Sequence, residues 1–90
     1  MEIQKSDIVR ALAGRDKNKF FFVIETEGDY VHIADGKSRK LETPKRKKVK
    51  HVAFRAKSDS RAANKLRNGE KVTNSEIRRT LADFAADDGE

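Results

Sequence analysis

Apolar residues in the first half of the chain fall into short runs separated by turn signals, a pattern typical of β-strands. DIVRALAG at 7–14 and DYVHIAD at 29–35 alternate between two faces, whereas KFFFVIET at 19–26 is apolar on both faces. The latter pattern is expected of a strand that is buried on both sides or bent across a barrel. Gly28-Asp29 and Asp35-Gly36 supply short turns after the second and third runs.

Two weaker runs bring the expected number of strands to five. Residues 39–41 are expected to form the fourth strand and KVKHVAFR at 48–55 the fifth. Alternation fails between Val49 and Val52. The fifth strand therefore either carries a bulge at this point or is wrongly assigned there.

Five short strands in about 55 residues would make a poor open sheet, with exposed edges and one small buried face. Curling into a barrel removes most of the edge. We therefore predict a mainly β fold, a small and strongly bent five-stranded β-barrel over residues 1–56. Its core is expected to bury one set of side chains together, namely Phe20, Phe22, Ile24, Val31 and Ile33.

The composition changes after the fifth run. Val, Ile, Leu and Phe make up 15 of the first 54 residues but only 5 of the remaining 36, a level that tends towards disorder when charge is high. The fold is therefore expected to lie in the first 55 residues, with a short helical appendage behind it. Residues 57–72 are expected to form a basic linker or a short helix ending at Gly69, and residues 87–90 a disordered tail.

Residues 73–86 have the pattern of an amphipathic helix. Thr73 and Glu76 have the spacing of a capping box, and Ile77, Leu81 and Phe84 recur on one face. A helix of this length is marginal by itself in water. We expect it to dock either over one opening of the barrel or on a protein partner.

Charge is abundant and unevenly distributed. Charged residues make up 40% of the chain, against roughly 25% in an average soluble domain. The net charge is +6, but residues 37–50 carry +7 and residues 51–72 carry +4. A field concentrated in this way attracts polyanions.

The stretch TPKRKKVKH at 43–51 holds five positive charges in six residues. Thr43 precedes Pro44, so the chain is extended there, and we expect residues 45–48 to form a loop that follows a phosphate backbone. One alternative is a solvated loop that keeps a thin-cored protein soluble, and another, for a eukaryotic cell only, is a nuclear address. We favour contact with RNA, because the sequence offers little to compensate the mutual repulsion of these cations.

Gly14 begins a second candidate loop, GRDKNK. Glycine lets the backbone turn and allows close approach of a ligand, and Arg15 suits a phosphate or an unpaired base. A hairpin loop that needs Gly14 only for its geometry is an equal alternative. The loop lacks the second glycine and the Gly-Lys-Ser/Thr ending of nucleotide-hydrolase loops.

DIVRALAGRDKNKFFFVIE resembles the KOW motif, with Gly14 at the position of its key glycine. The loop is similar to the GRDKGK loop of large-subunit ribosomal proteins that carry a KOW domain, but Asn18 stands where they often have glycine. Asparagine tolerates left-handed dihedrals better than most residues. YVHIADGKSRKLETPKRKKVKHV at 30–52 looks like small bacterial KOW-domain RNA-binding proteins. The resemblance implies an SH3-like barrel, no catalysis and binding to structured RNA, often ribosomal RNA.

The remaining candidate binding residues have two roles open to them. Tyr30 and Phe54 are either core side chains, the more common role on strands of a small barrel, or platforms on which bases stack. His51 either contacts RNA or packs in the structure.

No chemistry other than binding is expected. The chain has no cysteine, and its two histidines, His32 and His51, have no carboxylate at ligand spacing, so neither a metal site nor a cofactor is expected. No nucleophile and base are paired, and a barrel of this size is not expected to hold a deep pocket of ~300 Å³ or more. With no signal-peptide run and no window near ~18 apolar residues, a cytoplasmic protein without a membrane partner is expected.

The charge pattern predicts a non-catalytic RNA-binding protein with no small-molecule substrate, and the resemblance to KOW-domain proteins implies that it belongs to the translation apparatus. Its RNA would be ribosomal RNA or another structured RNA, bound as a permanent ribosomal component or as an assembly factor. The alternative is a protein-interaction module of the translation or transcription machinery, which uses the face of Ile77, Leu81 and Phe84. The expected RNA contacts are Arg15, Lys17, Lys19, Lys37, Arg39, Lys40, Lys45, Arg46, Lys47, Lys48, Lys50 and His51.

Overall fold

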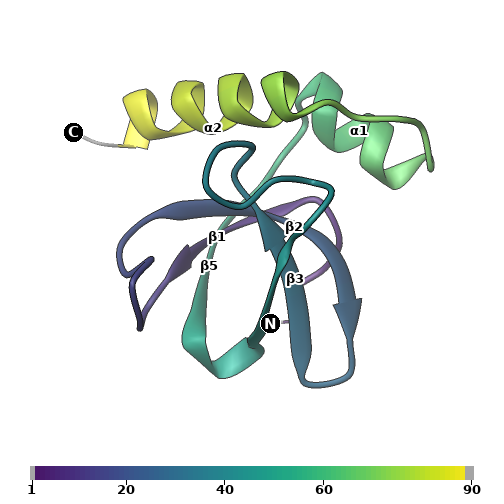
Figure 1. The fold of residues 1–90 in the computed structure, drawn as a ribbon. Coiled ribbons are helices and arrows are strands. Elements are labelled where there is room, and N and C mark those ends of the chain that lie inside the picture. The colour runs from purple at the N-terminus through teal and green to yellow at the C-terminus, as the bar shows by residue number, and fades with distance from the viewer. Residues whose placement is uncertain (1, 89–90) are drawn as a thin grey trace.

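The computed structural model describes residues 2–88 as a five-stranded antiparallel sheet followed by two helices (Figure 1). The strand order is β4-β3-β2-β1-β5, and every neighbouring pair is antiparallel. Neither helix has the length and apolarity that crossing a lipid bilayer requires, within the residues described. The elements are β1 (Asp7–Ala11), β2 (Phe20–Glu27), β3 (Tyr30–Ala34), β4 (Lys45–Lys48), the 3-10 helix η1 (Val49–His51), β5 (Val52–Lys57), α1 (Arg61–Arg67) and α2 (Asn74–Asp88).

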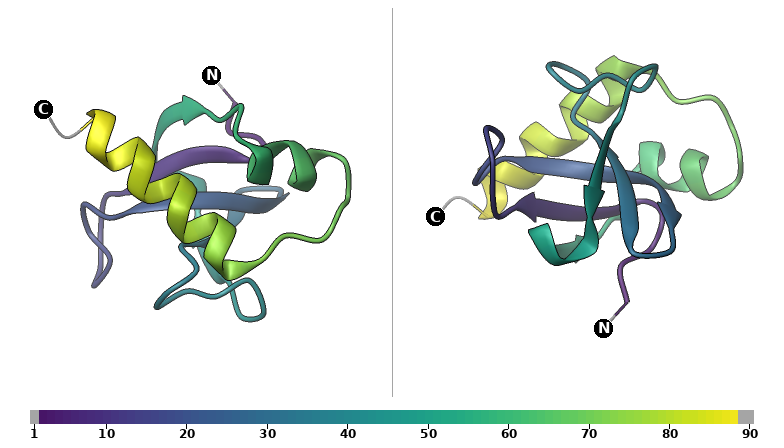
Figure 2. Two further views of the ribbon diagram at one scale, coloured as in Figure 1. Left: turned by 90° about the horizontal axis from the view of Figure 1, so that it is seen from above. Right: turned by 60° about the horizontal axis from the view of Figure 1, so that its bottom comes forward.

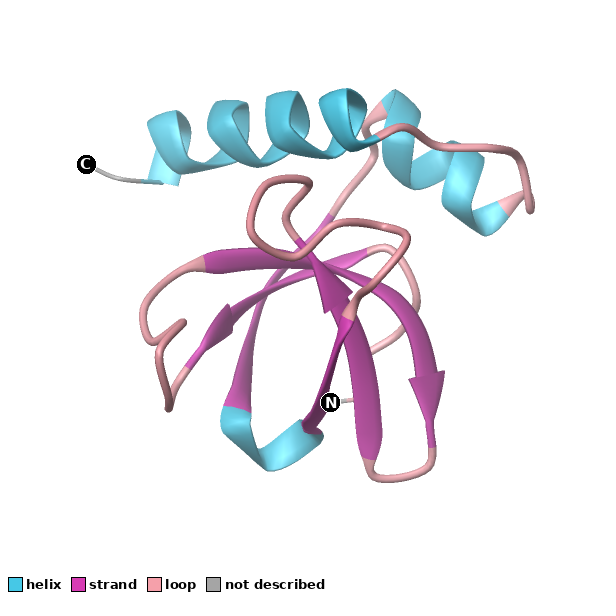
Figure 3. Ribbon diagram, viewed as in Figure 1, coloured by secondary structure: helices cyan, strands magenta, loops and turns pink. Residues whose placement is uncertain are grey.

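The sheet is strongly bent, and the connection between its two edge strands shows why. β4 and β5 are at opposite edges of the strand order, yet only the three residues of η1 join them. Three residues span little more than ~10 Å, so the edges must curl towards each other. Figure 3 shows η1 bridging the two ends below the curved sheet. Register shifts between Ile8 and Val9 and between Val23 and Glu25 add local bends.

The side chains of β2 are divided between two cores, which explains why this strand is apolar on both faces. Phe21 and Val23 are fully buried on the inner side of the bend, with Val31 and Ile33 of β3. Phe22 is buried on the other side, against the helices, and Phe20 and Ile24 pack there in part. The expectation that Phe20, Phe22 and Ile24 share a core with Val31 and Ile33 is therefore wrong. Alternation places neighbouring residues of β2 on opposite faces.

The two helices complete the second core and are more than an appendage. Figure 2 shows α2 lying across the sheet, with α1 beside it. Ile77 and Leu81 of α2 are buried against Ile8 and Phe22 of the sheet. Burying each such aliphatic side chain contributes about 1.5–3 kcal/mol. α1 adds Ala62, Ala63 and Leu66 to the same cluster.

The predicted capping box of α2 is confirmed. Thr73 N donates to Glu76 Oε1 at 3.0 Å, and Glu76 N donates to Thr73 Oγ1 at 3.2 Å. The helix continues through Asp88, so residues 87 and 88 of the expected disordered tail are helical, while residues 89–90 lie outside the described residues. The expected linker at 57–72 contains α1, whose first turn is capped by Ser60 Oγ accepting from Ala63 N at 3.1 Å.

The fourth strand is not where the sequence placed it. Residues 39–41 belong to a loop, because Asp35 Oδ1 accepts hydrogen bonds from Lys37 N at 2.9 Å and Arg39 N at 2.8 Å and closes a tight turn. β4 is instead the basic run Lys45–Lys48, which was expected to be a loop. The failed alternation between Val49 and Val52 marks the 3-10 turn of η1, which interrupts the predicted fifth strand.

The loop at residues 35–44 is fixed to the start of α2. Leu41 N donates to Asn74 Oδ1 at 2.8 Å, and Asn74 Nδ2 donates to Glu42 Oε1 at 3.0 Å. Arg78 Nη1 donates to the carbonyl of Gly36 at 2.6 Å. The loop runs so close to the helix that a Cβ on Gly36 would lie 2.4 Å from Asn74 O. The helix therefore holds the segment that leads into β4.

Candidate nucleic-acid interface

β4 is an edge strand made entirely of cationic residues. Tyr30 pairs with Lys48 and His32 pairs with Arg46, so these four side chains share one face of the sheet. Lys45 and Lys47 lie on the opposite face, where their partners Ile33 and Val31 are buried. At the edge of a sheet, side chains from both faces can reach the same space. β4 can therefore present all of its charges to one ligand.

An open hollow of about 500 Å³ lies beside β4. The sequence led us to expect no deep pocket of ~300 Å³ or more. The hollow exceeds this volume, but it is an open groove on the surface rather than a deep pocket. We call the part of this lining that can meet a ligand the β4 surface, and define it as Arg15, Tyr30, Lys45, Arg46, Lys47, Lys48 and His51. The full lining adds Ala13, Gly14, Asp16 and Arg39.

The Gly14 loop has the backbone that its sequence predicts. Gly14 has φ +82° and Asn18 has φ +74°, so asparagine adopts the left-handed conformation in place of a second glycine. Asn18 N donates to Ala11 O at 2.8 Å, and Lys19 N donates to Asp16 O at 3.0 Å. The loop is thus tightly wound, and Arg15 projects from its exposed side at the hollow.

Arg39 and Lys47, two of the expected RNA contacts, also hold the site together. Arg39 donates from Nε at 3.1 Å and from Nη2 at 2.9 Å to Oδ2 of the buried Asp16. Lys47 Nζ donates to the carbonyl of Ala13 at 2.8 Å, and its half-buried stem lies on the same face as Val31. Both side chains tie the Gly14 loop to segments far along the chain. Their charge still contributes to the positive field.

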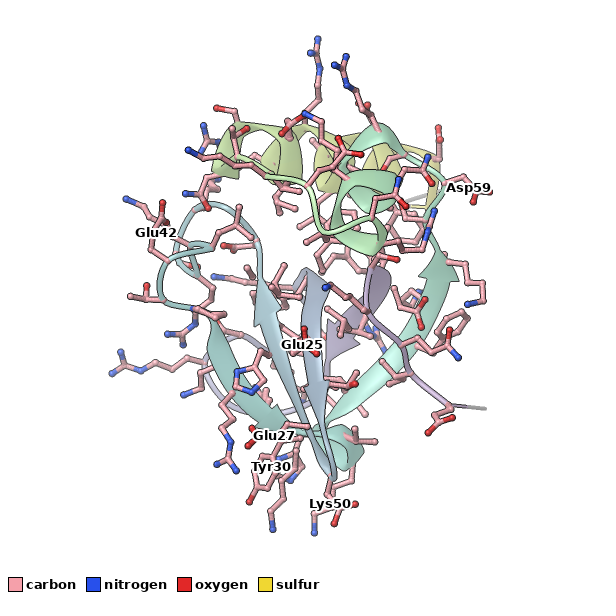
Figure 4. All side chains as sticks on the ribbon, turned by 90° about the vertical axis from the view of Figure 1, so that its right-hand side faces the viewer. Glu25, Glu27, Tyr30, Glu42, Lys50 and Asp59 are labelled. Carbon is pink, nitrogen blue, oxygen red and sulfur yellow. The ribbon has the colours of Figure 1, made fainter. Side chains whose placement is uncertain are left out.

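Arg46 is stacked on Tyr30. Its guanidinium carbon lies 3.6 Å from the centre of the Tyr30 ring. Its Nε is 3.4 Å from Glu27 Oε1, which also lies 3.0 Å from His32 Nε2. Figure 4 shows Glu27 and Tyr30 close together at one end of the sheet. The hydrogen bond from His32, followed by the bond and charge of Arg46, lowers the pKa of Glu27 below its ordinary value of 4.5. Glu27 is therefore ionised at neutral pH.

The other expected RNA contacts are distributed around this centre. Lys19 and Lys37 line a neighbouring hollow of about 570 Å³ together with Asn18 and Phe20. Lys50 lines a third hollow, of about 410 Å³, with Tyr30 and Lys48. Lys17 and Lys40 are exposed, and His51 is half-buried in the lining of the main hollow.

Two further candidates have clear positions. Phe54 is half-buried in β5, opposite Val9, and is not part of the lining beside β4. The proposed partner face of α2 is turned onto the sheet, where Ile77 and Leu81 are buried. The Phe84 ring meets the Phe20 ring edge-on, with 5.2 Å between the ring centres.

Within residues 2–88, no three His, Asp or Glu side chains are grouped as a metal ion would need.

Sequence reasoning missed the residues that organise the site. The contacts of Asp16 and Glu27, and the stacking of Arg46 on Tyr30, depend on which segments become neighbours. Because β4 was misplaced, no such neighbour could be assigned. Asp16 itself was a useful signal, because it is an acidic residue within a basic loop and a lone carboxylate there needs a partner.

Comparison of the chain with known proteins adds no assignment: no family model and no curated protein sequence matches it.

Proposed function

We propose that this protein is a non-catalytic RNA-binding protein that docks structured RNA on the β4 surface. The observation that carries the proposal is the meeting of cations from separate segments around one hollow. Arg15 comes from the Gly14 loop, His51 from η1, and Lys45–Lys48 from the edge strand. Such a track offers point charges and a planar guanidinium to successive phosphates.

The electrostatic balance supports an external polyanion. Among residues 2–88, Asp16 is the one acid in the lining, and Arg39 already binds it. Glu27 offsets part of the charge of Arg46. The cations of β4 therefore repel one another with little internal compensation, and a phosphate backbone would relieve that repulsion.

Protection of an exposed sheet edge is a simpler role for lysines on β4, because charge on an edge strand prevents pairing with other chains. That role needs only the strand itself. It does not account for Arg15 and His51 reaching the same hollow from other segments, nor for the stacked Tyr30. We therefore favour the RNA-binding role.

The finer features of the proposal come from the resemblance to KOW-domain proteins. They are an SH3-like barrel, a cytoplasmic location, and ribosomal RNA or another structured RNA bound in association with the ribosome or ribosomal proteins. The strong bend of the sheet supports the barrel, and the left-handed Asn18 supports the KOW-like loop.

The alternative, a protein-interaction module that uses α2, has less support. Ile77 and Leu81 are buried against the sheet, so a partner on that face would have to displace the helix and expose the second core. A partner would need a different surface of the protein.

The proposal is tested by titrating a fluorescently labelled RNA hairpin with the full chain at low ionic strength and measuring anisotropy. We expect saturable binding that an excess of unlabelled RNA competes away. Crosslinking in cells, followed by sequencing of the attached RNA, then identifies the ligand. A lack of binding in dilute buffer, where screening is weakest, would overturn the proposal.

A further inference from the structure

The stack of Arg46 on Tyr30 is the feature of the β4 surface that phosphate binding leaves unexplained. A lysine binds phosphate as a point charge and needs no fixed orientation. The guanidinium carbon of Arg46, by contrast, lies over an aromatic ring, 3.6 Å from its centre, which is a cation–π contact. Glu27 approaches Nε of the same guanidinium, and His32 in turn holds Glu27.

This arrangement restricts an exposed side chain. The Arg46 side chain is 53% exposed, and an arginine so exposed ordinarily samples many rotamers. The ring covers one face of the guanidinium, and the carboxylate of Glu27 orients its edge. The other planar face is left for a ligand. Because Tyr30 and Arg46 both line the hollow, that ligand would share the space with the phosphate-binding cations.

Nucleic-acid bases stack on arginine planes and on aromatic rings when they are not paired within a helix. Inside a continuous duplex, each base is covered by its neighbours and cannot reach a protein side chain in this way. The hollow of about 500 Å³ falls in the size range of pockets that take small organic ligands, to which a single nucleotide belongs.

We propose that the hollow takes an unpaired nucleotide, whose base stacks on the Arg46 guanidinium while Arg15, Lys45 and Lys48 bind the flanking phosphates. The inference rests on the proposed function and specifies its substrate: RNA with a bulge, a loop or a single-stranded end, rather than uninterrupted duplex. Tyr30 and Glu27 act as positioning residues for Arg46.

Two blunt-ended RNA hairpins with the same stem test the proposal, each closed by a non-nucleotide linker so that the loop offers no unpaired base. One is fully paired, and the other has a bulge of two adenosines, the first of which is replaced by 2-aminopurine. The wild-type protein is expected to bind the bulged RNA about tenfold more tightly and to change the fluorescence of the probe as the base stacks. Arg46→Lys keeps the charge but removes the planar group. It is expected to bind both RNAs equally and to leave the affinity for the paired hairpin within about twofold of wild type.

Tyr30→Leu, which keeps an apolar side chain under Arg46, is expected to give the same loss of preference. Lys45→Gln is the matched control, since it removes one phosphate-binding charge and should weaken both complexes alike while preserving the preference. If the wild type binds both hairpins equally, or if Arg46→Lys retains the preference, base stacking is refuted while RNA binding stands. If neither hairpin binds, both proposals fail.

Discussion

Arg39 donates two hydrogen bonds to the same carboxylate oxygen of Asp16, at 2.9 Å from Nη2 and 3.1 Å from Nε. The contact joins the Gly14 loop to the loop at residues 35–44, which α2 holds from the other side. Asp16 is buried, and the side chain of Arg39 is 30% exposed. An acid within the basic surface therefore has a structural purpose, namely to hold its two loops together.

Replacing Asp16 with Asn is expected to weaken RNA binding even though it adds one net positive charge. Loss of the carboxylate leaves Arg39 without its partner. This should cost about 1–3 kcal/mol of stability, less than the ~3–5 kcal/mol of a fully buried pair, because Arg39 is partly exposed. The loops then separate, and the cations no longer share one hollow. Urea unfolding gives the stability, and an RNA titration gives the affinity.

Asp59→Asn provides the matched control, because it makes the same change of charge at a fully exposed side chain, as Figure 4 illustrates. Charge alone would tighten RNA binding slightly in both variants. If Asp16→Asn binds RNA as tightly as Asp59→Asn, the pairing of Asp16 with Arg39 has no role in shaping the site.

Gly36→Ala is expected to lower the free energy of unfolding by about 3 kcal/mol or more. Gly36 has φ +77°, which costs a side chain about 1–2 kcal/mol. In addition, its new Cβ would lie 2.4 Å from the backbone oxygen of Asn74, so the loop and α2 would have to move apart. Chemical unfolding followed by circular dichroism measures the effect.

Gly28→Ala separates these two causes. Gly28 also has a positive φ, +57°, but a Cβ there would meet nothing within 4 Å. This variant should lose only the ~1–2 kcal/mol of backbone strain. Equal losses at the two glycines would contradict the close approach of the loop to α2.

Glu76 makes part of the stability depend on pH. The hydrogen bond from Lys65 Nζ at 2.8 Å, followed by the backbone bond from Thr73, lowers the pKa of Glu76 below its ordinary value of 4.5. A carboxyl whose pKa is lower in the folded state adds stability above the unfolded-state pKa, and this contribution is lost as the pH falls through the folded-state pKa. Glu76→Gln should therefore be less stable than wild type at pH 7.

The difference between Glu76→Gln and wild type should shrink below about pH 4.5 and vanish once Glu76 is protonated. Thermal unfolding at a series of pH values measures it. Glu70→Gln, the same substitution at an exposed position, is the control. A stability difference that is the same at pH 3 and pH 7 would show that the capping box and Lys65 do not act through the charge.

The sequence predicted those parts of the fold that leave a local signal. Alternation and turns identified the first three strands, the spacing of Thr73 and Glu76 identified the capping box, and the GRDKNK loop predicted a left-handed Asn18. β4 has no apolar residue, so only its pairing with β3 defines it. The run at residues 39–41 suggested a strand, but the side chain of Asp35 closes a turn that ends at Arg39.

The candidate site was predictable in charge but not in geometry. The run of cations is visible in the sequence. Its placement at the edge of the sheet is not visible there, because this placement depends on how the whole sheet pairs and bends. The division into two cores was missed for a related reason. Alternation shows that β2 is buried on both faces but does not say that the helices supply the second layer.

The central claim is that the β4 surface binds the phosphates of RNA, and a fourfold variant addresses it. Lys45, Arg46, Lys47 and Lys48 are replaced by Gln, which keeps the first part of the aliphatic stem at position 47 over the core. The matched control replaces four cations on other surfaces, Lys5, Arg61, Lys71 and Arg79, by Gln and so carries the same net charge. Circular dichroism establishes that both variants remain folded.

The deciding measurement is the slope of log K for a structured RNA against log salt concentration. On the fully paired hairpin, Arg46 has no unpaired base to stack on, and Arg15 and the four cations of β4 should each neutralise a phosphate. The wild type and the control are then expected to give a slope of roughly −3.5 to −4.5, and the β4 variant about −1. A β4 variant whose slope equals that of the wild type would contradict the account.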